Sequence, residues 1–258
     1  MPEGSSANER GQSMHVSDHT TRVFDADLIK LTQMVAQMGG LVQKLVTESI
    51  DALGRRDIVL AKQLIAADET VDELQRQIEE KAVATIALRQ PMAVDLRALV
   101  AMLRIANDLE RIGDLAKNIG KRVIAVGEDH SRRTLMRGLR HMATLVISQL
   151  AAVLDSFVDR DALKALRVWQ GDKEVDALYV SLFRELITYT MEDPGTVTMC
   201  IHHLFCAKNI ERIGDHATNI AEAVYYMVEG RAIEGARPKG DTSSYENERR
   251  LAPSKVPA

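Results

Sequence analysis

The chain has 258 residues, of which 46% are hydrophobic and only 4% aromatic, and it carries a formal net charge of −4 with a pI near 6.0. This length allows a sizeable core, and the many aliphatic residues with little proline between residues 23 and 230 favour helices over sheet. The slightly acidic balance offers no positive field to a polyphosphate backbone, which excludes nucleic acid as an expected partner.

Both ends of the chain are polar and rich in small residues. Residues 1–22 lack the apolar core of a signal peptide, and nowhere do 18 apolar residues run together, so neither a signal peptide nor a membrane-spanning helix is predicted. We therefore expect a cytoplasmic protein without direct membrane insertion, with disordered tails at residues 1–22 and 231–258.

The sequence between these tails repeats itself. DETVDEL (68–74) aligns with DKEVDAL (172–178) at an offset of 104 residues. LERIGDLAKNI (109–119) aligns with IERIGDHATNI (210–220) at an offset of 101. The offset changes near proline-containing turns, where loop length varies easily. This pattern indicates a tandem duplication of one unit.

The first unit, residues 23–127, is expected to hold three helices. Its first helix is marked by side chains that repeat every three or four positions, which is typical of a bundle: Leu28, Leu31, Val35, Met38, Val42, Leu45, Ser49 and Ala52. Asp57 is the expected N-cap of a second helix that runs to about Arg89. Pro91 starts the third helix, which ends near Val126.

The second unit, residues 131–230, repeats this plan, with helices expected near 132–158, 161–191 and 195–229. Short connections make neighbouring helices antiparallel, so each unit is predicted to be a three-helix bundle. The predicted fold class is all-α: two tandem, pseudo-repeated three-helix bundles with six long antiparallel helices.

Acidic side chains four residues apart recur on the second and third helices of each unit. Four residues along a helix correspond to a turn of about 40° and a rise of about 6 Å, so two such carboxylates share one face. Asp72 and Glu110 each lie 19 residues from Pro91, and the counts about Pro194 in the second unit are nearly as even. An antiparallel hairpin therefore brings the acids together in two quartets. They are Asp68, Asp72, Glu110 and Asp114 in the first unit, and Asp172, Asp176, Glu211 and Asp215 in the second.

These quartets are predicted metal sites. Like charges at this spacing cost each helix about 0.2 to 0.5 kcal/mol, and a bound cation removes that cost. Carboxylates without histidine or thiolate suit Mg, Ca, Mn or Fe better than a structural zinc. Asn118 and Asn219 are placed to orient the ligands, and Gly113 and Gly214 leave room for the helices to approach closely.

A simpler interpretation is a solvated acidic helix face. Acids at this spacing are commonly exposed, and Arg76 and Arg111 are placed to neutralise the first quartet through ordinary salt bridges. In the second unit Val180 stands where the first has Arg76, yet all four acids are present. That asymmetry, together with the repeated spacing, favours the metal sites.

Other chemically interesting side chains favour structural roles. The sequence contains no Ser/His/Asp or Cys/His arrangement that predicts a nucleophile, and no glycine-rich phosphate-binding loop. We therefore expect a protein that is not an enzyme. The residues interpreted as core or structurally satisfied are Trp169, Cys200, Cys206, His202 and His203. His216 follows Asp215 directly and is expected to project about 100° away from it.

Two segments resemble the signature sequences of a known family. RQPMAVDLRALVAMLRIANDLERIGDLAKNI and AKNIERIGDHATNIAEAVYYMVEG are similar to those of the PhoU family of phosphate-transport regulators, over about residues 24–229. The resemblance implies a cytoplasmic regulator that represses high-affinity phosphate uptake and phosphate-starvation signalling. Its implied partners are the ATPase of the phosphate-specific ABC transporter and the membrane sensor histidine kinase. The long tails and an alternative start at Met14 depart from the family pattern.

The resemblance also implies cofactors and an assembly. Members carry multinuclear metal clusters on E(D)xxxD motifs, and all four motifs are intact here: Asp68 with Asp72, Glu110 with Asp114, Asp172 with Asp176, and Glu211 with Asp215. Iron is the first expectation for the metal, with Mn, Mg or Zn as alternatives. A homodimer is the expected oligomer.

Two functions of other classes remain open from the sequence. A carboxylate-bridged metal oxidase also uses a helical bundle, but such sites need Glu-x-x-His pairs, whereas the acids here are followed by Asp. A purely structural dimerisation module would need the bundle without aligned acids.

Overall fold

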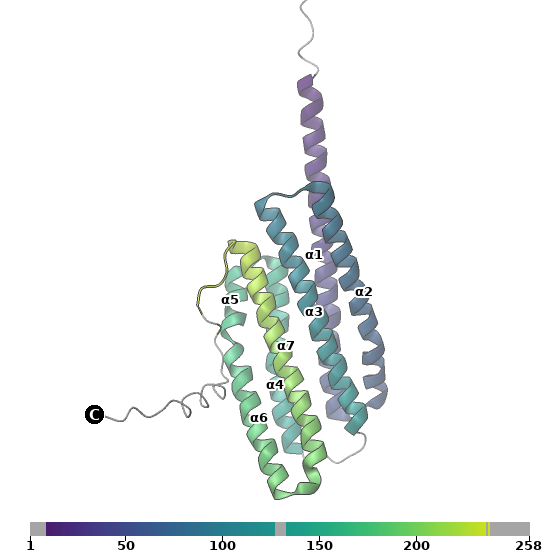
Figure 1. Ribbon diagram of the computed structural model, residues 1–258, viewed down its shortest axis with the longest axis vertical. Coiled ribbons are helices and arrows are strands. Elements are labelled where there is room, and N and C mark those ends of the chain that lie inside the picture. The colour runs from purple at the N-terminus through teal and green to yellow at the C-terminus, as the bar shows by residue number, and fades with distance from the viewer. Residues whose placement is uncertain (1–8, 127–132, 236, 238–258) are drawn as a thin grey trace, which may run out of the picture.

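The computed structural model of the chain describes residues 9–126, 133–235 and 237 (Figure 1). This part is built of helices and their connections, with no β-strand among the described residues. The helices in chain order are α1 (Glu9–Arg55), α2 (Ile58–Arg89), α3 (Ala93–Val126), α4 (Arg133–Asp159), α5 (Ala162–Gln170), α6 (Asp172–Glu192), the short 3₁₀ helix η1 (Pro194–Thr196) and α7 (Val197–Glu229). The prediction of an all-α fold is confirmed.

Two helical bundles lie side by side (Figure 1). The first contains α1, α2 and α3, the second contains α4 to α7, and the most extensive packing in the molecule joins α3 to α7. One continuous hydrophobic core passes through both halves and includes Leu31 and Ile112 of the first and Phe157 and Ile213 of the second. The predicted seam of α1 is buried in this core, except that Leu28 is half-buried.

An aspartate begins the second helix of each half. Asp57 accepts a hydrogen bond of 2.9 Å from the backbone N–H of Leu60, and Asp161 accepts one of 2.9 Å from Lys164. Such a cap satisfies a backbone donor that the first helical turn leaves without a partner. The predicted N-cap at Asp57 and the end of α2 at Arg89 are confirmed.

The second helix of the second half is interrupted, which differs from the prediction of one helix over 161–191. α5 ends at Gln170, and the Gly171 N–H bonds to the carbonyl oxygens of Arg167 and Val168 before α6 begins at Asp172. Glycine lowers helix propensity by about 1 kcal/mol relative to alanine, and Gln149 Nε2 of α4 donates a 3.2 Å hydrogen bond to the Gly171 carbonyl oxygen at the break. The interruption places Asp172 in the first turn of α6.

The prediction of disordered tails is wrong for the parts of residues 1–22 and 231–258 that the structure describes. α1 begins at Glu9, so residues 9–22 continue a helix that extends beyond the bundle (Figure 1). A helix already nucleated by packing adds residues at little cost, which polar composition alone does not reveal. At the other end, Ile233 packs against the core and Arg237 forms ion pairs, so this segment is docked. Residues 1–8 and 238–258 lie outside the described residues.

One helix of the described chain is long and apolar enough to cross a membrane by length and composition, Met136–Asp159 of α4. Its apolar side chains instead contribute to the core between α1, α5 and α7. Leu139, Val146 and Leu150 are almost completely buried there. The high hydropathy of α4 therefore reflects its packing inside the bundle.

Candidate metal centres

The first acidic cluster, defined as Asp68, Asp72, Glu110 and Asp114, forms where α2 faces α3. Burial raises the pKa of the Glu110 carboxyl, Arg111 opposes the rise, and the negative charges of Asp114 and Asp72 add to it. Asp68 is only 3% exposed, and burial raises its pKa as well. The charges of Asp72 and Asp114 contribute to that rise. The two helices therefore bring the four carboxylates onto one patch, where they repel one another.

Lys117 on α3 bridges the first cluster. Its Nζ donates a hydrogen bond to Asp68 Oδ2 and lies 2.6 Å from Asp114 Oδ1. Burial alone would lower the pKa of Lys117, but the hydrogen bonds with these two aspartates raise it, so the amine stays charged. Arg111 adds longer contacts, of 3.3 Å to Glu110 and 3.6 Å to Asp114.

Gly113 allows the close approach of α2 and α3 at this cluster. A Cβ atom on Gly113 would lie 3.3 Å from Asp68 Oδ1 and 3.3 Å from Val71 Cγ1, which is tighter than ordinary contact. At Gly214 an added Cβ would meet side chains of α4 and α6 at 3.5 to 3.6 Å, none of them an acid of the cluster. The predicted close approach is therefore present in the first hairpin and looser in the second.

The second acidic cluster, defined as Asp172, Asp176, Glu211 and Asp215, joins α6 to α7. Asp172 and Asp176 are 2% and 7% exposed. Burial raises the pKa of the Glu211 carboxyl and a hydrogen bond from Lys208 opposes the rise. The charges of Asp215 and Asp176 raise that pKa further. These four carboxylates also share one patch.

Arg237, from the segment after α7, bridges the second cluster. Its Nε donates to Asp172 Oδ2 at 2.9 Å and its Nη2 donates to Asp215 Oδ1 at 2.7 Å. The other oxygen of Asp172 accepts a 3.2 Å hydrogen bond from Thr218. Lys208 lies 2.8 Å from Glu211 Oε1. Each cluster thus contains its own cation between an acid of one helix and an acid of the next.

The sequence analysis did not find these cations. Lys117 and Lys208 lie three residues from an acid of the same helix, a spacing that predicts such contacts. Arg237 lies 22 residues beyond the nearest acid that it binds, so no local pattern indicates it. Arg76 pairs with a glutamate of its own helix. The contrast between Arg76 and Val180, which favoured the metal sites in the sequence, therefore does not distinguish the two clusters.

Both clusters retain oxygen atoms without a hydrogen-bond partner. Asp68 Oδ1, Glu110 Oε2 and Glu211 Oε2 are buried and accept no hydrogen bond. Buried carboxylate oxygens of this kind fit the ligand preference of hard divalent cations. As the side chains stand, however, no group of three or more His, Cys, Asp or Glu in the described part of the chain is placed to hold one ion. Lys117 and Arg237 instead occupy other oxygens of these acids, Asp68 Oδ2 and Asp114 Oδ1 in the first cluster and Asp172 Oδ2 and Asp215 Oδ1 in the second.

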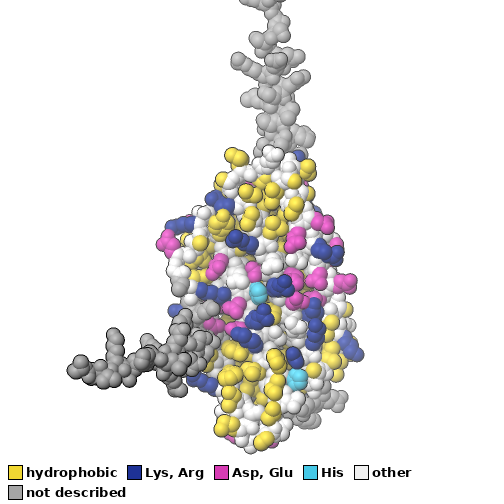
Figure 2. Space-filling view, viewed as in Figure 1, with side chains coloured by type: hydrophobic (Ala, Val, Ile, Leu, Met, Phe, Trp, Pro, Cys, Tyr) yellow, Lys and Arg dark blue, Asp and Glu magenta, His cyan; other side chains and the backbone are white. Residues whose placement is uncertain are grey.

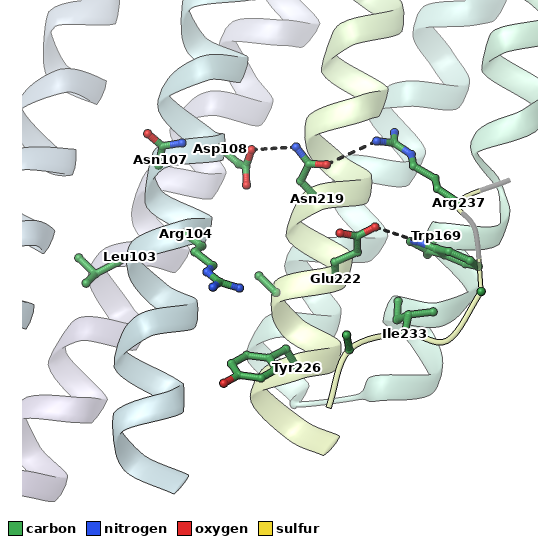
Figure 3. Close-up of a pocket in the computed structure, with 13 residues that line it drawn as sticks. Leu103, Arg104, Asn107, Asp108, Trp169, Asn219, Glu222, Tyr226, Ile233 and Arg237 are labelled. Atoms are coloured by element: carbon green, nitrogen blue, oxygen red, sulfur yellow. Dashed lines mark hydrogen bonds between the residues drawn. The ribbon is translucent and has the colours of Figure 1, made fainter. Parts of the chain in front are cut away.

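A cavity of about 540 Å³ adjoins the second cluster (Figure 3). It lies between α3, α5, α7 and the segment that follows α7. On one side Asn219 donates a 3.3 Å hydrogen bond to Asp108, and on the other Trp169 Nε1 donates a 2.9 Å hydrogen bond to Glu222. Arg237 reaches past this cavity to the acids and contacts Asn219 at 3.4 Å.

Two of the histidines have structural partners. His203 Nδ1 lies 2.8 Å from the carbonyl oxygen of Met199, and burial lowers the pKa of the imidazole. His216 Nδ1 lies 2.8 Å from Asp108 Oδ1 on α3, so it points across the two halves and away from the second cluster. His203 thus has a structural partner at Nδ1, whereas its Nε2 and the Nδ1 of His202 are buried without a hydrogen-bond partner. His216 projects away from Asp215, as expected.

Comparison with known proteins places this architecture in a family. The family model described as "PhoU domain" matches residues 35–123 and 139–224, one match in each half. A relative from Rhizobium meliloti, described as "Phosphate-specific transport system accessory protein PhoU homolog", is 53% identical over 226 residues, 88% of this chain and 95% of its own length. A relative from Caulobacter vibrioides with the same description is 48% identical over 89% of this chain and its own full length.

Solved structures agree with these sequence comparisons. The crystal structure of PhoU from Pseudomonas aeruginosa is 39% identical, with a TM-score of 0.78 over 81% of this chain and all of that one. The phosphate transport system regulatory protein PhoU from Streptococcus pneumoniae is 29% identical, with a TM-score of 0.77 over 82% of this chain and all of that one. The repeated helical hairpins and the duplicated match together show that this chain belongs to the PhoU family.

Proposed function

We propose that this chain is a cytoplasmic negative regulator of high-affinity phosphate uptake and of phosphate-starvation signalling. In this proposal it acts as a metal-binding adaptor between the ATPase of the phosphate ABC transporter and its sensor histidine kinase. The observation that carries the proposal is the 53% identity to a phosphate-specific transport system accessory protein across 95% of that protein. The adaptor role and the two partners go further than that description.

Exposed apolar side chains at the ends of the bundles support an adaptor. Figure 2 shows hydrophobic side chains gathered at both ends of the visible face, with acidic and basic side chains intermixed between them. At the α6–α7 end, Met191 and Val197 each lie three residues from Pro194, and Ile187 and Ile201 each lie seven residues from it. All four apolar side chains are exposed. Contiguous exposed apolar patches mark protein-interaction sites, and these four side chains are the ones we assign to such a patch.

The two acidic clusters would hold the metal, with iron as the first candidate and Mn, Mg or Zn as alternatives. A bound cation would neutralise carboxylates that now repel one another and would fix the spacing of each hairpin. Glu110→Gln combined with Asp114→Asn is expected to lower the metal content of the purified protein, measured by elemental analysis. Equal metal in wild type and this variant would contradict the assignment of the first cluster.

The regulatory role is tested by deletion of the gene in its host with a phosphate-starvation reporter. We expect the reporter to become active at high phosphate and to be repressed again when the full chain is restored. A reporter that stays repressed in the deletion strain would refute the proposed function.

Co-purification of the transporter ATPase and the kinase with the wild-type chain tests the adaptor step. We expect Met191→Glu to weaken this co-purification. Light scattering tests the expected homodimer.

A further inference from the structure

The two clusters have the same charge arrangement but obtain their bridging cation in different ways. In the first, Lys117 is part of α3 and connects Asp68 to Asp114. At the repeat offset of 101 residues, the equivalent of Lys117 is Thr218, a neutral residue. The bridging position of the second cluster is instead filled by Arg237, which lies outside the duplicated unit. The second cluster therefore depends on a segment that the bundle itself does not contain.

That C-terminal segment, defined as residues 231–235 and 237, returns along the bundle after α7. Gly230 ends α7 in a left-handed conformation with φ 74°, which turns the chain back. Ile233 then packs against the core, and the Arg237 side chain is only 19% exposed. The Arg237 guanidinium directs all of its described polar contacts to Asp172, Asp215 and Asn219. Figure 3 shows the contact with Asn219.

Apart from these contacts, the C-terminal segment has one apolar anchor, Ile233, which packs against the core. The segment lines the cavity of about 540 Å³ together with residues of α3, α5 and α7. Arg231 and Glu234 are exposed and pair with each other at 3.5 Å, so neither anchors the segment to the bundle. Charge-assisted hydrogen bonds are about twice as strong as neutral ones, so the ion pairs of Arg237 with the cluster add substantially to the packing of Ile233 in attaching the segment.

We propose that Arg237 is a displaceable occupant of the second acidic cluster, so that a divalent cation and the C-terminal segment compete for Asp172 and Asp215. This inference rests on the proposed metal-binding function. The guanidinium already takes Oδ2 of Asp172 and Oδ1 of Asp215, and Thr218 takes the remaining oxygen of Asp172. A cation that coordinates these oxygens therefore repels Arg237 and replaces it. Metal binding thereby releases the C-terminal segment from the surface of α7.

The chain contains its own reporter for this exchange. Trp169 is the single tryptophan of the sequence and lines the same cavity as Ile233 and Arg237. It is 7% exposed. Release of the segment should open this environment to water and shift the tryptophan emission maximum to longer wavelength.

The test is a calorimetric titration of the full chain with Mn²⁺. All variants carry Asp114→Asn, which disrupts the first cluster and leaves the second cluster intact. Arg237→Ala should bind Mn²⁺ more tightly than its parent by at least about tenfold, because no charge-assisted hydrogen bonds have to be broken. Arg231→Ala removes a positive charge from the same segment without touching the cluster, and should bind like the parent. Circular dichroism confirms that each variant is folded.

The wavelength of the Trp169 emission maximum gives a second readout. Paramagnetic Mn²⁺ can quench the emission intensity, but quenching does not shift this wavelength. It should shift with Mn²⁺ in the parent and in Arg231→Ala, and should not shift further in Arg237→Ala. Equal Mn²⁺ affinity in the parent and Arg237→Ala would overturn the competition and leave metal binding intact. Binding by wild type that disappears in the Asp114→Asn background would also overturn it, because only the first cluster would then bind metal. Absence of binding in every variant, wild type included, would refute both this inference and the metal-binding part of the proposed function.

Discussion

Asp68 and Asp172 occupy equivalent positions and face the same physical problem. Each carboxylate is almost completely buried, at 3% and 2% exposure. Burying a charge without a partner costs several kcal/mol, so each must be paired, protonated or bound to a cation. Lys117 and Arg237 provide the pairing. A metal ion would offset the same cost, which is why a bridging cation and a metal are alternatives at these residues.

The first prediction concerns Lys117. Lys117→Met should lower the free energy of unfolding by about 3 kcal/mol, because it removes one partner of a buried ion pair and leaves Asp68 uncompensated. Urea denaturation of the metal-free protein measures the change. Lys121→Met, at an exposed position of the same helix, serves as the control and should cost less than about 0.5 kcal/mol. Adding Asp68→Asn to Lys117→Met should recover most of the loss, and a double variant as unstable as the single one would contradict the pairing.

His203 gives a prediction about pH. Burial lowers its pKa below the ordinary value of 6.5, and the charges of His202 and Arg56 act in the same direction. The unfolded chain therefore binds a proton at higher pH than the folded chain does, so stability falls as the pH drops below 6.5 toward the folded pKa. His203→Asn should flatten this fall, measured as the unfolding free energy between pH 7 and pH 5. An unchanged slope, with the exposed His141→Asn as control, would contradict the assignment.

At the scale of the helices, the aspartate caps of α2 and α5 provide a paired prediction. Asp57→Ala and Asp161→Ala should each cost about 1 kcal/mol, because each removes the acceptor for a backbone N–H of the first turn. Asp57→Asn and Asp161→Asn keep an acceptor oxygen and should cost much less. The measurement is urea denaturation, and equal losses for the alanine and asparagine variants would show that charge, not capping, is the cause.

The helices themselves were largely predictable, since their signals are local. The helix boundaries of the first half were predicted to within a few residues. The signals were Asp57, Pro91 and the repeat of apolar side chains every three or four positions in α1. The break at Gly171 was missed because one glycine inside a long periodic segment weakens a helix without fixing where it stops. The helix over residues 9–22 was missed because their polar composition resembles that of a tail.

At the scale of the whole molecule, the convergence of each acid quartet was predictable because it follows from counting along an antiparallel hairpin. The cations were harder to predict. Lys208 lies within one helical turn of Glu211, and its contact follows a known spacing rule. Arg237 reaches its acids only after the chain has reversed at Gly230 and crossed the surface of the second bundle. Such a contact depends on tertiary structure, and no periodicity or motif in the sequence encodes it.

The shared core makes a final prediction about how the two halves unfold. Because the core is continuous across α3 and α7, neither half can unfold without exposing apolar surface of the other. We therefore expect a single cooperative transition despite the duplicated sequence. Trp169 fluorescence reports on the second half, and far-UV circular dichroism reports on all helices, so their urea curves should coincide. An additional circular dichroism transition without a fluorescence change would mean that the first bundle unfolds alone, and the duplicated units would then be independent domains.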